Sequence, residues 1–162
     1  MKMKRMLLLL VIAGGVFSVV GCLKNDDDYK PCVERTIEDD MPAMAKFAAH
    51  SSINTTQDGN GLLYQIIEPG TGATPTASST VIAKYVGRTL DGKGFDSSYV
   101  RDPAGTEFPL NGVIRGWTLG ISKIKEGGKI KLIIPSSLAY GCALHPLQNK
   151  PLYFYVELVK VK

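Results

Sequence analysis

Alternating hydrophobic and polar positions dominate the chain after Gly61 and predict a series of β-strands. The clearest alternation closes the chain, in the segment 152–161, where one face carries four apolar side chains: Leu152, Phe154, Val156 and Leu158. Successive side chains of a strand point to opposite faces of a sheet, so this strand is expected to bury one face. Shorter runs of apolar and β-branched residues predict four more strands: 62–68, 80–90, 107–110 and 129–134.

Turn residues separate these strands and limit how they can pair. Pro69-Gly70 ends the first strand, and Asp91-Gly92 follows the second at once, a dipeptide typical of tight connections between antiparallel strands. Pro109 lies within the third strand. Because proline has no N–H to donate to a neighbour, this strand is expected at a sheet edge or at a bulge.

Apolar residues repeat with helical spacing in two other segments. In 34–50 they follow one another at intervals of three and four residues: Ile37, Met41, Met44, Phe47 and Ala48. Pro42 fits this helix if the regular turns begin at that residue, since proline is tolerated in a first turn. The segment 113–121 predicts a short second helix whose apolar side consists of Val113, Ile114, Trp117 and Ile121.

The order of these elements predicts an α+β fold with an antiparallel sheet. Strands follow strands with one embedded helix, whereas a parallel sheet would need a crossover helix between its strands. We expect the sheet domain to cover residues 62–162. The helical segment 34–61 is expected either to pack on this domain or to act as a short spacer before it.

The first 21 residues have the pattern of a secretory signal peptide. Three basic residues precede an uncharged run, 7–20, which is shorter than the roughly 20 apolar residues that span a bilayer. The run ends in Val19-Val20-Gly21-Cys22, which resembles the lipobox of bacterial lipoproteins. This resemblance implies a lipid anchor on Cys22 that holds the protein on a membrane of the cell envelope, and we expect the periplasmic or surface face of the outer membrane. An ordinary cleaved signal with an incidental cysteine is the alternative.

Residues 22–33 are expected to form a polar tether, with three aspartates in a row at 26–28. The acidic triplet resembles export signals of surface lipoproteins, or it only adds solubility. Of the 19 basic and 15 acidic residues, three basic ones lie in residues 1–21, which leaves 16 against 15, a net charge of +1 in place of +4. The basicity of the whole chain therefore gives no argument for nucleic-acid binding, and we expect a monomer.

The other cysteines and the histidines offer little site chemistry. Cys32 and Cys142 could pair in an oxidising compartment. One lies in the polar tether and the other in a distant loop, so two free thiols are expected, with a disulfide as the alternative. His50 and His145 have no partner at ligand spacing, so we expect no metal site.

Four blocks of the sequence resemble the FKBP-type peptidyl-prolyl cis–trans isomerases. Residues 84–98 read KYVGRTLDGKGFDSS, which is similar to the family's Tyr-x-Gly followed by Asp-Gly-x-x-Phe-Asp-Ser-Ser. Residues 113–117 read VIRGW, the family's turn into its single helix. Residues 126–141 read EGGKIKLIIPSSLAYG, and residues 152–158 read LYFYVEL. The blocks keep the family's order and spacing across roughly residues 62–162.

The resemblance implies a five- or six-stranded antiparallel half-barrel sheet, wrapped around one short helix, with an apolar pocket for proline between them. The catalytic positions that it implies are Tyr85, Phe95, Asp96, Ile114, Trp117, Tyr140 and Phe154. The further substrate-binding positions are Phe108, Val113 and His145.

Individual roles follow from the same resemblance. Trp117 is expected under the proline ring. The N–H of Ile114 and the hydroxyl of Tyr140 are expected to donate hydrogen bonds to carbonyls of a proline-containing polypeptide. Asp96 is expected to bond Tyr85 or a nearby arginine.

An apolar pocket suits the reaction that the resemblance implies. Rotation about an X-Pro bond has a barrier of roughly 18–20 kcal/mol, because amide resonance must be broken. A twisted amide is less polar than a planar one, so an aromatic site suits it better than water does, and fixed hydrogen bonds can hold the flanking carbonyls. No bond to the substrate forms, so no nucleophile, metal or cofactor is needed. We expect an enzyme that assists the folding of envelope or surface proteins.

Other interpretations stay open for several of these residues. After Gly141 the chain reads CALHPLQNKPLYF, which is shorter than the family's loop and lacks its Ile-Pro-Pro, the part that overhangs the pocket. A low-turnover chaperone or peptide-docking module is therefore the alternative function. The aromatic residues could be ordinary core, and Asp96, before two serines, could only cap a turn.

Overall fold

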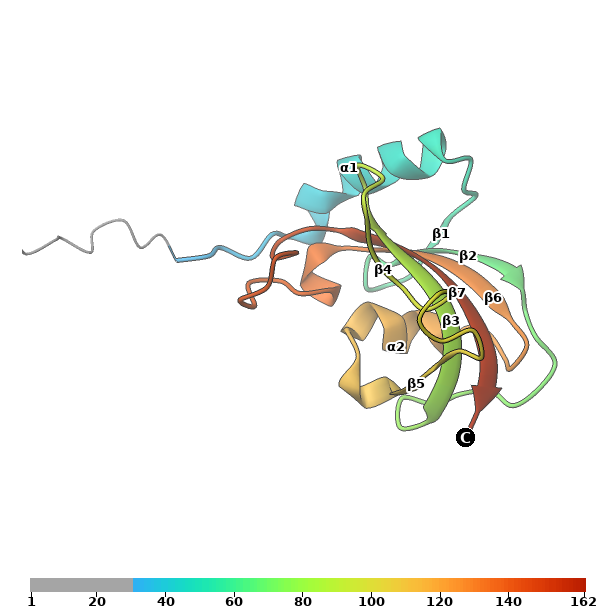
Figure 1. Ribbon diagram of the computed structural model, residues 1–162. Helices are drawn as coiled ribbons and strands as arrows, with labels where there is room; N and C mark the ends of the chain where they lie inside the picture. The colour runs from blue at the N-terminus through green and yellow to red at the C-terminus, as the bar shows by residue number, and fades with distance from the viewer. Residues whose placement is uncertain (1–30) are drawn as a thin grey trace, which may run out of the picture. The chain divides into compact units, whose positions relative to one another are not determined.

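A seven-stranded antiparallel sheet forms the centre of the computed structural model, which describes residues 31–162. The strands are β1 (Thr56–Gln57), β2 (Leu63–Glu68), β3 (Thr80–Thr89), β4 (Gly94–Ser97), β5 (Thr106–Pro109), β6 (Lys129–Ile134) and β7 (Leu152–Val161). Their order is β1-β2-β6-β7-β3-β4, and β5 pairs with the beginning of β3 while β4 pairs with its end. The sheet curves around a short helix (Figure 1), so the predicted α+β fold is confirmed.

The five strands predicted from the alternation are all present, each within one residue of its expected ends. β5 pairs only with β3, which agrees with the edge position that Pro109 predicts. The sheet has seven strands where five or six were expected, because β1 and β4 add to it. These two strands have only two and four residues, too few to show a period of their own.

The inner face of the sheet holds the helix α2 (Arg115–Ile121) and the larger hydrophobic core. Trp117 and Ile121 are buried there, together with apolar side chains of β6 and β7. Glycine lets the helix approach the sheet closely, since a Cβ at Gly120 would lie 2.5 Å from a methyl carbon of Leu132. This close packing fixes the distance and orientation of α2, and therefore of its first residues, relative to the sheet.

The start of α2 differs from the prediction. Hydrophobic spacing predicts a helix from residue 113, but Val113 and Ile114 are extended and follow a short 3-10 turn, Leu110–Gly112. Ile114 is the N-cap, and its carbonyl accepts a hydrogen bond from the N–H of Trp117 at 2.9 Å. An apolar residue at the N-cap continues the apolar face of the helix that follows it, so hydrophobic spacing alone cannot distinguish the cap from the first residues of the helix.

The outer face of the sheet is covered by α1 (Ile37–His50), which lies on the other side of the sheet from α2 (Figure 1). Met44 and Ala48 of α1 are buried against Leu63 and Ile133, which lie opposite each other where β2 pairs with β6. The neighbours of Ile133 in β6 face the inner core. The helix therefore packs on the sheet, the first of the two arrangements expected for it.

A capping box starts α1 five residues before Pro42. The hydroxyl of Thr36 accepts a hydrogen bond from the N–H of Asp39 at 3.2 Å, and the Asp39 carboxylate accepts one from the N–H of Thr36 at 2.9 Å. Pro42 thus lies inside the helix, and the condition under which it was expected to fit, that regular turns begin there, is not met. The carbonyl that proline leaves without a donor belongs to Glu38, which is exposed and can bond water.

A buried carboxylate joins α1 to the turn that follows β6. Asp40 is fully buried, and its Oδ2 accepts hydrogen bonds from the N–H and the hydroxyl of Ser136 at 2.7 and 2.6 Å. Its Oδ1 accepts a hydrogen bond from Nε of Arg35 at 2.7 Å. Ser136 begins a 3-10 turn, Ser136–Leu138, which leads to Tyr140. The position of α1 is thereby coupled to that of Tyr140.

A disulfide between Cys32 and Cys142 makes a second link to the same region, so the prediction of two free thiols is wrong. The two Cα atoms lie 5.7 Å apart, within the usual range for a disulfide. The side-chain amide of Asn149 adds to the link by donating to the carbonyl of Val33 at 2.8 Å. The residues before α1 reach this loop because the start of the helix is anchored to Ser136, a tertiary constraint that cysteine spacing does not reveal.

The predicted signal peptide, Cys22 and most of the predicted tether lie outside the described residues. The end of the tether, Cys32 and Val33, is described and exposed. No helix within residues 31–162 is long and apolar enough to cross a membrane.

We expect Asp40→Ala to lower the free energy of unfolding by about 3 kcal/mol, because the buried N–H and hydroxyl of Ser136 lose their acceptor. Asp39→Ala is the matched control, since it removes an exposed carboxylate from the same turn, with an expected loss of about 1 kcal/mol. Urea unfolding of both variants measures the difference. Equal losses would show that Asp40 acts only as a first-turn acid of α1.

Candidate active site

A hollow of about 300 Å³ lies between α2 and the inner face of the sheet. Its lining consists of Tyr85, Phe95, Asp96, Phe108, Gly112, Val113, Ile114, Trp117, Tyr140 and Phe154. These include every residue that the sequence resemblance assigns to the site except His145. The fold therefore brings together side chains from four strands, the start of α2 and the turn after β6.

Trp117 is the centre of an aromatic cluster in this pocket. It is 4% exposed, and the rings of Tyr85, Phe108 and Phe154 lie around it with centroid distances of 5.0, 5.4 and 5.4 Å. All three pairs are edge-to-face, an arrangement worth about 0.5–1.5 kcal/mol beyond the area buried. The indole N–H of Trp117 is buried and has no acceptor within the described part of the chain. The rings thus form one rigid apolar lining.

Gly87 makes room for two of the rings. Phe95 and Phe154 pack edge-to-face with centroids 5.5 Å apart. A Cβ at Gly87, on β3, would lie 2.7 Å from the Phe95 ring and 2.8 Å from the Phe154 ring. Sequence reasoning did not assign this glycine to the site. The signal that could have found it is a glycine inside a strand, which often marks a close approach of another group.

Three polar side chains form a network at one side of the pocket. The hydroxyl of Tyr85 donates a hydrogen bond to Oδ2 of Asp96. Arg101 donates from Nη1 to Oδ1 of Asp96 at 3.0 Å and from Nη2 to the Tyr85 oxygen at 2.8 Å. The resemblance implies that Asp96 bonds Tyr85 or a nearby arginine. Asp96 bonds both, and the arginine is Arg101. The three side chains hold one another, so the carboxylate presents little uncompensated charge to the pocket.

The network sets the charge state of Asp96. Burial favours the neutral acid, but hydrogen bonds from Tyr85 and Arg101 outweigh burial and hold the pKa of Asp96 below its usual value. A carboxyl with a lowered pKa adds stability above its unfolded pKa, about 3.9, and loses it as the pH falls through the folded value. The ionised network is therefore complete at neutral pH. The Asp96 side chain is 40% exposed, so solvent screening keeps this contribution small.

Tyr140 offers a hydroxyl that is free to donate. Burial, and next the negative charge of Asp96, raises the pKa of Tyr140, so its phenol is protonated at neutral pH. Within residues 31–162 this hydroxyl makes no hydrogen bond. His145 stacks on the Tyr140 ring, with centroids 3.6 Å apart and planes 10° apart. The stacking limits where the Tyr140 ring can turn.

Ile114 offers a second donor. It is the extended N-cap of α2, so its N–H precedes the hydrogen-bonded turns of the helix. Among the described residues no acceptor pairs with this N–H. The pocket thus combines an aromatic lining with two unused donors, the N–H of Ile114 and the hydroxyl of Tyr140. Residues 31–162 contain no group of three His, Cys, Asp or Glu side chains that could hold a metal ion.

Known proteins share this sequence and fold. A family model described as FKBP-type peptidyl-prolyl cis-trans isomerase matches residues 72–159. The chain is 49% identical over 119 residues to the FKBP-type peptidyl-prolyl cis-trans isomerase FkpA of Escherichia coli, covering 72% of this chain and 43% of that protein. The chain belongs to the FKBP-type peptidyl-prolyl cis–trans isomerase family.

Solved structures of two peptidyl-prolyl cis-trans isomerases are similar in fold. The crystal structure of FkpA from Escherichia coli matches with a TM-score of 0.66 and 43% identity, over 77% of this chain and 62% of that chain. A crystal structure of a peptidyl-prolyl cis-trans isomerase from Pseudomonas syringae pv. tomato matches with a TM-score of 0.64 and 32% identity, over 80% and 98%. The chain spans less than half the length of the curated Escherichia coli relative.

The short loop 141–151, where the chain departs from the FKBP pattern, packs against the site. Leu147 is buried in the inner core, and the N–H of Asn149 donates to the carbonyl of Gly141 at 2.8 Å, which closes the loop on itself. Nδ1 of His145 accepts a hydrogen bond from the N–H of Leu147 at 3.1 Å. His145 therefore lies beside the aromatic pocket, stacked on Tyr140, and does not line it.

We expect Gly87→Ala to displace the rings of Phe95 and Phe154 and to lower turnover on a proline peptide about fivefold or more, because the reacting geometry depends on the lining. Gly94→Ala, on the paired strand, is the matched control, since no atom lies within 4 Å of an added Cβ there. Near-ultraviolet circular dichroism and turnover are measured together. A native-like aromatic spectrum with full turnover in Gly87→Ala would contradict the close approach.

Proposed function

We propose that this chain catalyses cis–trans isomerisation of X-Pro bonds in proline-containing polypeptides. The observation that carries the proposal is the pairing of a rigid aromatic lining around Trp117 with two unused donors, the N–H of Ile114 and the hydroxyl of Tyr140. Membership of the FKBP family supports the same reaction. The relatives from Escherichia coli and Pseudomonas syringae are named as peptidyl-prolyl cis-trans isomerases.

The pocket acts on the barrier through polarity and geometry. Amide resonance makes the planar X-Pro bond polar, and rotation through about 90° removes that resonance, which is why the barrier is roughly 18–20 kcal/mol. The aromatic lining is better suited to the twisted, less polar amide than to the planar one, so it binds the transition state more tightly. The two donors hold the flanking carbonyls while the bond turns, and no bond to the protein forms.

The network of Tyr85, Asp96 and Arg101 acts on the lining. Its hydrogen bonds fix the ring of Tyr85, which packs edge-to-face on Trp117 at 5.0 Å. Arg101 compensates the Asp96 charge, so the pocket stays apolar while one wall is polar. Asp96 is therefore a positioning residue in this mechanism, and it takes up no proton during the reaction.

We expect the purified protein to accelerate isomerisation of a short Xaa-Pro peptide equally with and without a chelator. Tyr140→Phe removes one donor without removing the ring, so it is expected to lower kcat/KM about tenfold at unchanged stability, the usual scale for one lost hydrogen bond. Tyr153→Phe is the matched control, because Tyr153 packs on α1 at the outer face.

A protease-coupled assay gives the rates, and thermal melts report stability. A rate equal to that of the uncatalysed peptide would reject the enzyme and favour a module that binds proline segments with low turnover. Two exposed aliphatic side chains support that second function: Val100, next to Arg101, and Leu144, next to His145, are both almost fully exposed. Such side chains offer apolar contact to an unfolded client.

We further propose that the chain is a lipid-anchored monomer of the cell envelope, most simply at the outer membrane, where it assists the folding of envelope or surface proteins. The support is the uncharged run 7–20 that ends at Gly21-Cys22, together with the disulfide between Cys32 and Cys142, since disulfides persist in oxidising compartments.

We expect Cys22→Ser to shift the protein from the membrane fraction to a soluble or secreted form, because the serine hydroxyl cannot form the thioether of a lipoprotein. Cys142→Ser serves as the control for loss of a cysteine and is expected to stay with the membrane. Fractionation of cells followed by immunoblotting measures both. Membrane association of Cys22→Ser equal to that of the wild type would reject the anchor.

A further inference from the structure

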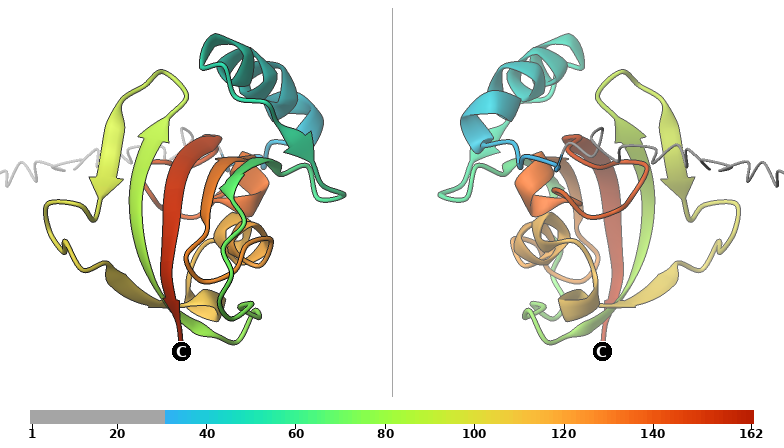
Figure 2. Two further views of the ribbon diagram at one scale, coloured as in Figure 1. Left: turned by 90° about the vertical axis from the view of Figure 1, so that its right-hand side faces the viewer. Right: turned by 90° about the vertical axis from the view of Figure 1, so that its left-hand side faces the viewer.

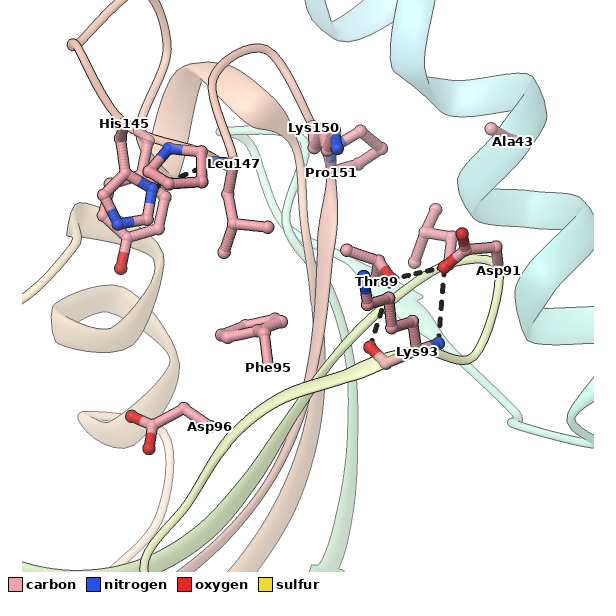
Figure 3. A pocket seen from close by; sticks show the side chains of 13 residues that line it. Ala43, Thr89, Asp91, Lys93, Phe95, Asp96, His145, Leu147, Lys150 and Pro151 are labelled. Atoms are coloured by element: carbon pink, nitrogen blue, oxygen red, sulfur yellow. Dashed lines mark hydrogen bonds between the residues drawn. The ribbon is translucent and has the colours of Figure 1, made fainter.

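A second hollow of about 760 Å³ continues from the proline pocket towards α1. It shares Phe95, Asp96 and Tyr140 with the pocket. Its other walls come from α1, the β3–β4 hairpin and the loop before β7: Ala43, Thr89, Leu90, Asp91, Lys93, His145, Pro146, Leu147, Lys150 and Pro151. Figure 3 shows Leu147 and Phe95 pointing towards each other across this space. We call this hollow the client groove.

We propose that the client groove binds the stretch of client polypeptide next to the isomerised proline, and that it prefers a stretch with apolar and acidic side chains. The inference rests on the proposed isomerase function, since it assigns a second subsite to the same substrate. The client groove is continuous with the proline pocket, and this continuity supports binding of the residues next to the proline. A chain that places proline against Trp117 can leave the pocket past Phe95 and Tyr140 and enter the groove.

The apolar preference follows from the lining. Leu90, Phe95, Pro146, Leu147 and Pro151 all contribute to the groove. Leu147 is buried in the core and Phe95 is half-buried, so both present fixed surfaces. An apolar client side chain gains roughly 25 cal/mol for each Å² that it buries against such surfaces.

The acidic preference follows from unequal charge in the groove. Lys93 and Lys150 line it, and neither has a carboxylate within salt-bridge distance among residues 31–162. Asp91 also lines the groove and stays ionised, because hydrogen bonds from the Thr89 hydroxyl and the N–H of Lys93, and then the charge of Lys150, lower the pKa of its carboxyl. Its charge offsets one of the two lysines and leaves the other without a compensating acid in the lining. With Asp96 paired to Arg101, the groove keeps an excess positive charge that an acidic client residue complements.

The walls of the groove are fixed before a client binds. α1 is held by the hydrogen bonds between Asp40 and Ser136, and the loop is held by the disulfide at Cys142. α1 and the tip of the β3–β4 hairpin lie at the same end of the sheet (Figure 2). A preformed groove avoids much of the ordering cost of binding, which favours a binding surface over a space that closes in solution.

The first test fills the groove from α1. Ala43→Trp places a large ring in it, and Ala45→Trp is the matched control, because Ala45 is exposed and points about 200° away around the helix. The measurement is the ratio of kcat/KM for an acidic dodecapeptide containing one proline to that for a tetrapeptide. Ala43→Trp is expected to lower this ratio about tenfold, since it removes binding energy used only by the longer chain. Ala45→Trp is expected to keep the wild-type ratio.

The second test reverses the charge. We expect wild-type protein to favour a dodecapeptide with glutamates around its proline over the matching lysine peptide about fivefold at low salt, and less at high salt. Lys93→Glu with Lys150→Glu is expected to reverse the preference. Lys160→Glu makes a charge change of the same kind on β7, outside the groove, and is expected to keep it.

Binding of labelled dodecapeptides, followed by fluorescence anisotropy, separates this proposal from the proposed function because it requires no turnover. Absent tetrapeptide turnover with Ala43-dependent binding would reject the isomerase and leave the groove in place. Equal ratios in Ala43→Trp and Ala45→Trp, or no difference between the glutamate and lysine peptides, would overturn the client groove.

Discussion

The fold depends on covering both faces of β6 and β7. Leu132 and Phe154 lie opposite each other in this pair and face the inner core, while the next pair along, Ile133 and Tyr153, faces the outer cluster. Because side chains alternate along a strand, one helix cannot cover both sets. α2 covers the inner set and with it forms the aromatic pocket. The outer set needs α1, and this requirement makes the N-terminal segment part of the folded domain.

Covering the outer face has a consequence for the site on the inner face. Tyr140 is bracketed by two links to the N-terminal segment, one from Ser136 to Asp40 and the other from Cys142 to Cys32. The links differ in chemistry, since one is a set of hydrogen bonds to a buried carboxylate and the other is covalent. A free donor in the pocket is therefore oriented by residues about 100 positions earlier in the chain.

The sequence predicted those parts of the structure that repeat or match a motif. β7 shows four alternating apolar positions, and the four family blocks contain eight of the residues that line the pocket. β4 was missed because four residues, one of them Gly94, carry no period. The start of α1 was missed because Pro42 suggested a later beginning, while the capping box that decides it uses Asp39 in place of the more usual glutamate. The disulfide and the client groove depend on where α1 docks, which no local pattern encodes.

The disulfide also decides how mechanical load would enter the protein. A pull on the chain before Cys32 divides at that residue, one part passing along the backbone into α1 and the other passing through the sulfur atoms to Cys142. The second part arrives two residues from Tyr140. Asn149 resists it there, because its side-chain amide donates a hydrogen bond to the carbonyl of Val33 and its N–H donates one to the carbonyl of Gly141. Tension on the leading segment would thus reach the edge of the pocket through the disulfide at the same time as it reaches the outer face of the sheet through α1.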